Sequence, residues 1–212
     1  MIAAYSQIRR VGGRHISKTL ISVVGLCLWA SQAIAAPNPQ AVIKSGTDQV
    51  LQFLKQYPEN TRVRREKIRA VVDEYVGEYF DFDEIAKRAL GSRWCEQSPE
   101  KQQEFTREFR QLLFDTYIGK IEKYVNEKIT YNEKQVGSNC AVIEALEVGG
   151  QSGAVPIDYY LRLKDGKWKV YDVAVEGIGL VSNYHSQFEA ILLRNSFDDL
   201  LRQLKEKLAT QG

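Results

Sequence analysis

Residues 153–193 read GAVPIDYYLRLKDGKWKVYDVAVEGIGLVSNYHSQFEAILL and determine how the rest of the chain must be arranged. At the start of this stretch, apolar side chains recur at every second position, which is the period of a strand. Asp165-Gly166 supplies the two positive-φ residues of a tight hairpin turn, and a return strand follows over 167–175. After Glu176-Gly177 the period changes to 3.6, which predicts an amphipathic helix over 180–193. A strand pair that is apolar on both faces requires cover on each side.

The preceding sequence predicts two more strands, over 127–136 and 139–148, joined to this hairpin by short turns. Short connections favour an antiparallel meander, and long strands favour a strong twist. Helices are predicted on both sides of the meander along the chain, over 39–56, 60–79, 81–90, 99–124, 180–193 and 197–208. The expected fold class is α+β: a twisted four-stranded antiparallel meander, covered by N-terminal and C-terminal helices, with an apolar cavity and an NTF2-like outline.

Two helix starts carry clear capping signals. Asp81 is followed three residues later by Glu84, which is the spacing of a capping box, and Gly91 is the expected C-terminal stop. Ser98-Pro99 places a capping residue directly before a proline at the first helical position. The acidic residues of the first signal are therefore explained by helix capping.

The N-terminus has the three parts of a secretory signal peptide. A basic region precedes an apolar stretch over 19–30, and Ala33-Ile34-Ala35 is a small-x-small cleavage site. The apolar stretch is about a dozen residues long, whereas a membrane-spanning helix requires about 20. We expect a cleaved signal over 1–35 and a single exported, soluble domain over 36–212.

Removal of the signal peptide changes the charge of the protein. Residues 1–35 contain four basic and no acidic residues, so the formal charge changes from +2 to −2, with 25 basic against 27 acidic residues. A nucleic-acid-binding domain would carry a basic surface. We therefore expect no nucleic-acid partner.

Two cysteines, Cys95 and Cys140, remain after cleavage. In an oxidising compartment such a pair can form a disulfide, and two separate thiols are equally compatible with the sequence. A disulfide between Cys95 and Cys140 would have a structural role.

The search for catalytic residues is mostly negative. His185 is the one histidine beyond the signal, and the sequence contains neither HExxH nor a cysteine–histidine cluster with metal-ligand spacing. We expect no catalytic residues, no metal site and no cofactor.

One enzymatic alternative stays open. A curved meander with helices on its concave side is also the plan of NTF2-like isomerases, some of which use a buried carboxylate and a tyrosine. Asp172 lies on the same strand face as Trp168 and Val170, and Asp158 lies one strand over. A carboxylate in an apolar pocket has a raised pKa and can act as a base. The competing interpretation is that both acids face solvent or bond to neighbouring backbone.

A binding protein agrees better with the composition. The chain has 11 tyrosines, whose rings present an apolar body and a polar tip at a cavity wall. Ligand pockets are typically apolar with few polar groups. An exported protein with such a pocket and no catalytic residues is typical of a carrier of hydrophobic molecules.

The segment GKWKVYDVAVEG (166–177), followed by LVSNYHSQF (180–188), strongly resembles the MlaC family, the toluene-tolerance family of periplasmic phospholipid-binding proteins. Supporting segments are FDEIA (82–86) with Leu90-Gly91 and Trp94, and Glu104 through Tyr117. The resemblance covers essentially the whole mature chain. It departs from the family pattern at His185, where an arginine is expected, and in the cysteine pair.

The resemblance implies a lipid shuttle. Family members carry phospholipid across the periplasm between an outer-membrane lipoprotein–porin complex and an inner-membrane ABC transporter with an MCE-domain subunit, in maintenance of outer-membrane lipid asymmetry. The phospholipid is cargo, not a cofactor. Residues for the wall of the lipid cavity are chosen by strand face and helix face: Tyr75, Phe80, Phe82, Leu113, Tyr117, Ile157, Tyr159, Leu161, Val170, Val181, Tyr184 and Phe188.

Overall fold

The structure is a computed structural model that describes residues 38–56, 67, 70, 74, 76–121, 128–148 and 155–211. The predicted signal peptide over 1–35 and the predicted wall residue Tyr75 lie outside these residues. Within the described part of the chain, no helix is long and apolar enough to cross a membrane.

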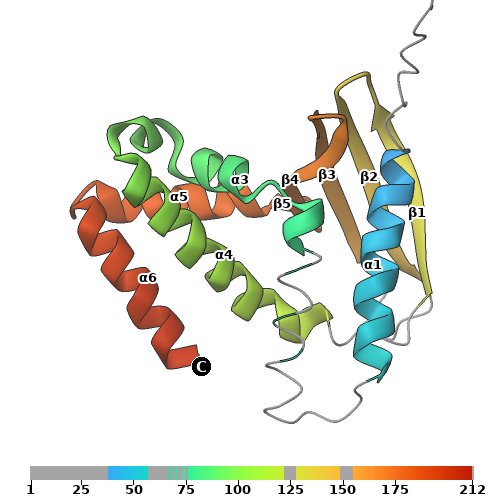
Figure 1. Cartoon of the computed structure of the whole chain (residues 1–212), viewed down its shortest axis with the longest axis horizontal. Coiled ribbons are helices and arrows are strands. Elements are labelled where there is room, and N and C mark those ends of the chain that lie inside the picture. The colour runs from blue at the N-terminus through green and yellow to red at the C-terminus, as the bar shows by residue number, and fades with distance from the viewer. Residues whose placement is uncertain are drawn as a thin grey trace, which may run out of the picture. The chain divides into compact units, whose positions relative to one another are not determined.

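An antiparallel sheet forms one side of the domain (Figure 1). Its strands follow the chain order: β1 (Lys128–Val136), β2 (Cys140–Val148), β3 (Pro156–Lys164), β4 (Lys167–Val175) and β5 (Ile178–Gly179). The predicted hairpin turn is confirmed, because Asp165 and Gly166 have φ values of 50° and 74° and Lys164 pairs with Lys167. The meander and the α+β class are confirmed as well.

The described sheet has five strands, so the prediction of four strands is wrong. Glu176 and Gly177 adopt φ values of 52° and 79°, which reverses the chain directly after β4. Ile178 then pairs with Val175, and Gly179 pairs with Ala174. A two-residue strand is too short to show a sequence period, so the pattern of apolar residues did not reveal it.

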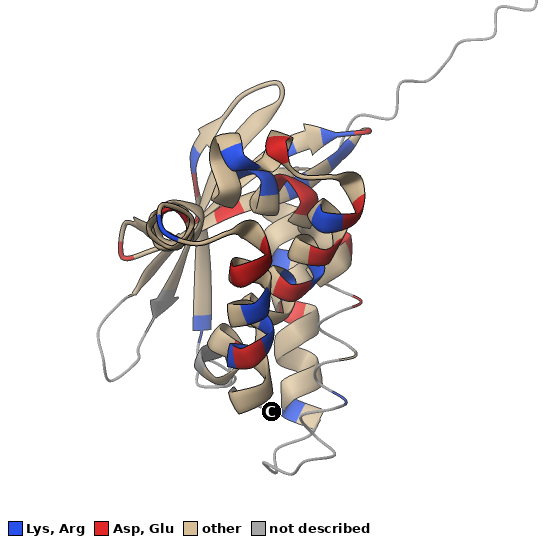
Figure 2. Ribbon diagram, turned by 90° about the vertical axis from the view of Figure 1, so that its left-hand side faces the viewer, with Lys and Arg blue, Asp and Glu red and all other residues tan. Residues whose placement is uncertain are grey.

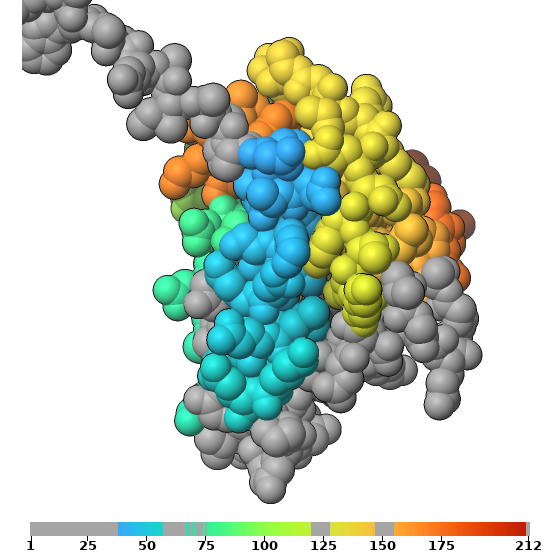
Figure 3. Space-filling view, turned by 90° about the vertical axis from the view of Figure 1, so that its right-hand side faces the viewer, coloured from blue at the N-terminus to red at the C-terminus, as the bar shows by residue number. Residues whose placement is uncertain are grey.

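Helices form the rest of the domain. They are α1 (Pro39–Gln56), α3 (Phe82–Leu90), the 3₁₀ helix η1 (Gly91–Glu96), α4 (Pro99–Ile121), α5 (Leu180–Leu192) and α6 (Phe197–Gln211), and residues 76–79 are also helical. Helix α1 lies along β1 and β2, as the space-filling view shows (Figure 3). Helices α3 to α6 form a separate group, joined to the sheet through β4 (Figure 1).

Asp81 joins the helical group to the sheet. It is the N-cap of α3, where its carboxylate accepts a hydrogen bond from the Glu84 N–H, and Gly91 with φ 56° is the C-cap, as the capping signals predict. The Asp81 carboxylate also binds Arg162 at 2.5 Å and Lys164 at 3.0 Å, both from β3. Burial alone would raise the pKa of Asp81, but the hydrogen bonds from these two cations hold it below its usual value.

The group of four helices has a filled core. We call its buried residues the helical core: Ile85, Ala86, Ala89, Leu90, Phe105, Phe109, Leu112, Val181, Tyr184, Phe188, Phe197, Leu200, Leu201 and Leu204. The Phe109 ring centroid lies 4.9 Å from that of Tyr184 and 5.1 Å from that of Phe188, both in edge-on geometry. Such contacts are the preferred arrangement of aromatic pairs.

A second core lies between α1 and the sheet. We call its buried residues the sheet core: Ile43, Ala141, Ile143, Leu161, Trp168 and Val170. Phe80 packs against both cores, because it forms a parallel bridge with Val170 at the free edge of β4 and precedes α3. Phe80 therefore contacts both the helical core and the sheet core.

The outer surface of the helical group is charged and mixed in sign (Figure 2). Lys101 pairs with Asp198 at 2.6 Å and Lys205 pairs with Glu104 at 2.5 Å, which ties α4 to α6. Exposed pairs of this kind contribute little stability each. This surface has the character of a solvated face.

The structure does not contain a disulfide between Cys95 and Cys140. Both thiols are free and exposed. Cys95 lies in η1, directly after α3, whereas Cys140 begins β2, the second strand of the sheet. The fold places the two cysteines on separate elements, and of the two alternatives left open by the sequence this structure has the separate thiols.

Candidate functional site

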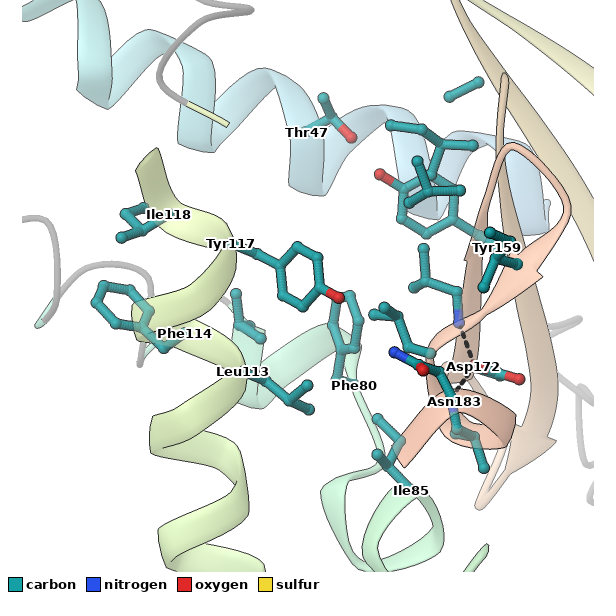
Figure 4. Close-up of a pocket in the computed structure, with 18 of the residues that line it drawn as sticks. Thr47, Phe80, Ile85, Leu113, Phe114, Tyr117, Ile118, Tyr159, Asp172 and Asn183 are labelled. Atoms are coloured by element: carbon teal, nitrogen blue, oxygen red, sulfur yellow. Dashed lines mark hydrogen bonds between the residues drawn. The ribbon is translucent and has the colours of Figure 1, made fainter. Parts of the chain in front are cut away.

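A cavity of about 440 Å³ lies between the sheet, α1, α4 and the segment around Phe80. This volume is within the range of roughly 300–1,000 Å³ that is typical of ligand pockets. Thr47 faces it from α1, Leu113 and Tyr117 from α4, and Tyr159 from β3 (Figure 4). Ile178 lines the cavity and is 65% exposed, so the cavity opens to solvent beside β5.

The apolar walls follow from the helical period of α4 and the alternating period of the strands. On α4, residues at spacings of three and four face the cavity, from Phe109 to Ile118. On the strands, alternate residues face inward, such as Ile157 and Tyr159 on β3 and Val173 and Val175 on β4. The helical face and the strand faces together form a space that favours hydrocarbon over water.

Seven of the predicted wall residues line this cavity: Phe80, Phe82, Leu113, Tyr117, Ile157, Tyr159 and Val181. They come from four separate parts of the chain, which the fold brings together. Whether they contact a lipid remains a prediction.

Four other predicted wall residues do not line the cavity. Leu161 and Val170 lie in the sheet core, and each has an exposed fraction of 0%. Tyr184 and Phe188 lie in the helical core, where they pack against Phe109. A strand or helix period identifies the inward face of an element, but it does not show whether that face meets another side chain or an open space.

Several residues of the wall were not predicted from the sequence. Thr47 and Leu51 line it from α1, Phe114 and Ile118 from α4, and Ile178 from β5. The α1 residues share a helix face with Ile43 and Leu54, which are buried. That spacing was a signal for an inward face of α1 that could have been used.

A smaller cavity of about 140 Å³ lies under α1. Its wall shares five residues with the larger cavity: Thr47, Leu51, Val76, Phe80 and Tyr159. The Cβ position of a side chain at Gly46 would lie 3.2 Å from the Tyr79 ring, so glycine permits this close approach of α1. These shared residues therefore border both cavities.

Two tyrosines near Thr47 have raised pKa values, and of these Tyr159 lines both cavities. Burial raises the pKa of Tyr159 to about 12, against a smaller effect of the Thr47 hydroxyl. Burial likewise raises the pKa of Tyr131, which also lies next to Thr47. Both phenols are therefore protonated at neutral pH and can donate hydrogen bonds.

Asp172 is the acidic residue that the enzymatic alternative singled out, and it lines the cavity. Burial raises its pKa, although the backbone N–H groups of Val181 and Val173 oppose that rise. Its Oδ1 accepts hydrogen bonds from the Val173 N–H at 2.8 Å and the Val181 N–H at 3.0 Å (Figure 4). Gly179, the N-cap of α5, has no side chain with which to cap the helix, so Asp172 supplies that cap from β4.

Asp158, the second acid of that alternative, is engaged elsewhere. Its carboxylate binds the Lys134 ammonium group at 2.8 Å, and Lys134 also binds Glu144 at 2.8 Å. This ion-pair group joins β1, β2 and β3. Asp158 is absent from the lining of the cavity and is therefore structural.

The other polar groups of the cavity do not form a catalytic cluster. The Arg110 guanidinium lies over the Phe82 ring, 5.0 Å from its centroid. His185 does not line the cavity, and its Nδ1 lies 3.1 Å from the Ala89 carbonyl oxygen in a contact between α5 and α3. Among the residues that the structure describes, no group of three or more histidine, cysteine or acidic residues could hold a metal ion. The arrangement is suited to holding an apolar molecule.

Comparison with known proteins agrees with this geometry. The chain is 28% identical over 178 residues to the toluene tolerance protein ttg2D of Pseudomonas putida, covering 83% of each chain. It is 23% identical over 192 residues to the intermembrane phospholipid transport system binding protein MlaC of Haemophilus influenzae, covering 88% of this chain and 90% of that one.

A solved structure is similar over most of its length. It is the phospholipid-binding protein of Ralstonia solanacearum in complex with a phospholipid, with a TM-score of 0.75 and 27% identity, covering 82% of this chain and 98% of that one. The sequence profile described as MlaC protein matches residues 44–206, which include α4, the whole sheet and α5. The chain therefore belongs to the MlaC family.

Proposed function

We propose that this protein is a carrier that binds a diacyl phospholipid in the cavity between its two cores. The observation that carries the proposal is the apolar cavity of about 440 Å³, in a fold that is similar to a phospholipid-bound protein. Two acyl chains with about 30 methylenes would cost on the order of 24 kcal/mol to expose to water. A cavity that replaces the bilayer removes most of this barrier.

The carrier would act in the periplasm, after cleavage of the signal peptide over 1–35. It would shuttle phospholipid between an outer-membrane lipoprotein–porin complex and an inner-membrane ABC transporter with an MCE-domain subunit. The chain would need no ATP site and no cofactor, since its partners would determine the direction of transport. The headgroup would remain at the opening beside Ile178, where the wall is exposed.

The acyl chains would lie against the inner face of the sheet and the cavity face of α4. The seven predicted wall residues that line the cavity are the proposed lipid contacts, together with Leu51 and Ile118. The NTF2-like outline expected from the sequence remains part of this proposal.

Native mass spectrometry of the exported, purified protein tests this proposal, with extraction and identification of the bound molecule. We expect one phospholipid-sized adduct on most molecules. Leu113→Glu places a charge in the cavity and should reduce the bound fraction. Leu193→Glu is the matched control, because Leu193 is 69% exposed and does not line the cavity. A protein that is empty after purification and takes up no lipid from vesicles would contradict the proposal.

An isomerase-type enzyme is the second candidate. The observation that favours it is the position of Asp172, a carboxyl group with a raised pKa that lines the cavity. Its Oδ1 is already engaged with two backbone N–H groups, so the carrier remains the better proposal. A protein found with a small carbonyl compound in place of a lipid, and that loses its turnover in Asp172→Asn, would favour the enzyme.

A further inference from the structure

Two hairpin turns of the described chain have the same backbone conformation. Asp165-Gly166 joins β3 to β4 with φ values of 50° and 74°, and Glu176-Gly177 joins β4 to β5 with φ values of 52° and 79°. Each turn has two residues, because the residues that flank it pair directly with one another. The fold therefore uses one kind of turn at two different places.

Aspartate suits the first position of this turn, and glutamate does not. Glycine, asparagine and aspartate are the residues that commonly adopt a positive φ there. Glu176 adopts a φ of 52° although it belongs to none of these types. Residues that are held in such a conformation are concentrated at functional sites. A role outside the turn itself would explain why a glutamate occupies this position.

The surroundings of the two turns are different. Val175, Glu176 and Ile178 line the cavity of about 440 Å³, whereas Asp165 and Gly166 line neither cavity. Glu176 is exposed, and so is Ile178, beside which the cavity opens. The side chain of Glu176 therefore lies at the opening of the cavity.

Glu176 is one of three charged residues on the described cavity wall, together with Arg110 and Asp172. The Arg110 guanidinium lies over the Phe82 ring, and Asp172 caps α5. The backbone N–H of Glu176 donates to the Pro156 carbonyl oxygen at 3.0 Å, but its carboxylate has no ion-pair or hydrogen-bond partner among the described residues. This carboxylate is therefore available to a group of opposite charge at the opening.

A carboxylate at this place can distinguish between phospholipid headgroups. The phosphate group is common to all phospholipids, but the group attached to it ends in an ammonium group in phosphatidylethanolamine and in uncharged hydroxyl groups in phosphatidylglycerol. A carboxylate attracts an ammonium group and accepts charge-assisted hydrogen bonds from it. Phosphatidylglycerol offers no positive charge to compensate the repulsion between its phosphate and the carboxylate.

We propose that Glu176 is a specificity-determining residue, which binds the ammonium group of a zwitterionic headgroup at the opening of the cavity. This inference rests on the proposed function. It adds that the protein prefers a lipid whose headgroup ends in an ammonium group over a lipid with a net negative headgroup. The unfavourable backbone conformation of Glu176 is retained because the longer side chain serves the ligand.

The test compares two lipids that share their acyl chains and differ in the headgroup. Vesicles contain equal amounts of phosphatidylethanolamine and phosphatidylglycerol, each with one palmitoyl and one oleoyl chain. The delipidated full-length mature protein is incubated with them, and native mass spectrometry with lipid extraction gives the ratio of the two bound lipids. We expect phosphatidylethanolamine to be favoured by about 2- to 5-fold, the effect of one exposed ion pair.

Glu176→Gln removes the charge and keeps the size of the side chain, so the ratio should approach that of the vesicles while lipid still binds. Asp165→Asn is the matched control, because it removes the same charge from the same position of the same kind of turn, away from both cavities. It should retain the ratio of the unmodified protein. Glu176→Asn should lose the preference and yet unfold at a higher urea concentration, because asparagine adopts a positive φ more readily.

Equal binding of the two lipids by the unmodified protein, or an unchanged ratio in Glu176→Gln, would overturn headgroup recognition and leave the carrier proposal intact. Loss of the preference in Asp165→Asn would also overturn it, because the effect would then come from overall charge. A lower urea midpoint in Glu176→Asn would show that the turn itself selects glutamate, which would count against the site. Binding of neither lipid would overturn the carrier proposal, and headgroup recognition with it. A preference that disappears in both Glu176 variants and persists in Asp165→Asn would support the site.

Discussion

The helical core and the cavity wall have similar side chains, yet the first is filled and the second is hollow. In the helical core, Phe105 has three aromatic neighbours within 6.0 Å, ring centroid to ring centroid. A few residues along the same helix, Leu113 and Tyr117 face a space of about 440 Å³. Apolar composition therefore does not by itself decide packing. The difference lies in what packs against each side of α4. Helices α5 and α6 contact one side, whereas the other side faces the sheet across the cavity.

The largest loss of stability should come from a substitution that creates a cavity in the helical core. Phe188→Ala removes a ring that contacts Phe105, Phe109 and Tyr184, and its site is 3% exposed. Truncation of a buried phenylalanine costs about 3–5 kcal/mol. We expect a loss of this size in the free energy of unfolding, measured by urea denaturation. A loss below about 1 kcal/mol would mean that the helical core relaxes around the gap and is not close-packed.

Two adjacent leucines of α4 give the most direct comparison between the filled core and the cavity wall. Leu112 is 1% exposed in the helical core, whereas Leu113 lines the cavity. Leu112→Ala should lower the free energy of unfolding by about 2–5 kcal/mol, because it creates a new void. Leu113→Ala enlarges an existing space, so we expect a loss of about 1 kcal/mol, from burial of fewer methylenes.

Lipid-free protein is required for this pair of measurements, since a ligand would stabilise the folded state. Urea denaturation of both variants under identical conditions gives the difference. Equal losses for Leu112→Ala and Leu113→Ala would contradict the assignment of a filled and a hollow side to α4.

The same distinction explains how far the sequence could predict this molecule. Strand β4 and the start of α5 lie where the alternation of apolar residues and its change of period place them, and Asp81 caps α3 as its spacing with Glu84 indicates. These features depend on neighbours along the chain. Strand β5 was missed because it consists of only two residues, Ile178 and Gly179.

The candidate site was predictable only in part. Face assignment placed Ile157 and Tyr159 correctly on the cavity wall. It could not distinguish them from Leu161, which shares their strand face but lies against Trp168 and Ile43 in the sheet core. That distinction depends on which residues of other elements, such as Ile43 of α1, pack against each strand position, which strand period does not encode.

A substitution at Asp81 tests the connection between the helical group and the sheet. Its effect on the free energy of unfolding should be smaller than that of the core variants. Asp81→Asn retains an oxygen that can cap α3 but removes the ion pairs to Arg162 and Lys164. Because Lys164 is 43% exposed and solvent screens its charge, we expect a loss of about 1–2 kcal/mol near neutral pH, measured by urea denaturation.

The pH dependence of that loss has a definite sign. The pKa of Asp81 is lowered in the folded protein, so its stabilising contribution is present above the unfolded pKa of about 3.9 and is lost as the pH falls through the lower folded value. The difference between the unmodified protein and Asp81→Asn should therefore shrink on acidification. A difference that stays constant from pH 7 to pH 3 would show that the cap and not the ion pairs is responsible.

The smallest effect is expected at Asp172, where the hollow region meets the filled one. Asp172→Ala removes the acceptor for the Val173 and Val181 N–H groups, and loss of a helix cap costs about 1 kcal/mol. Asp172→Asn should cost less, because it keeps an acceptor oxygen and avoids burial of a charge. Burial raises the pKa of Asp172 in the folded protein, so its ionised form is disfavoured there relative to the unfolded chain. The contribution of Asp172 to the free energy of unfolding therefore declines as the pH rises through that raised pKa.

Amide hydrogen exchange shows which part of α5 is affected by loss of the Asp172 cap. Only the first turn of α5 borders the cavity, through Leu180, Val181 and Asn183, while Tyr184 and Phe188 lie in the helical core. In Asp172→Ala, the Val181 amide should therefore exchange faster while amides from Tyr184 onward keep their protection, because the core still holds them. Faster exchange along all of α5 would mean that the edge of the cavity, and not the aromatic core, holds this helix in place. In that case α5 would belong to the cavity wall, and only α4 would separate the helical core from the cavity.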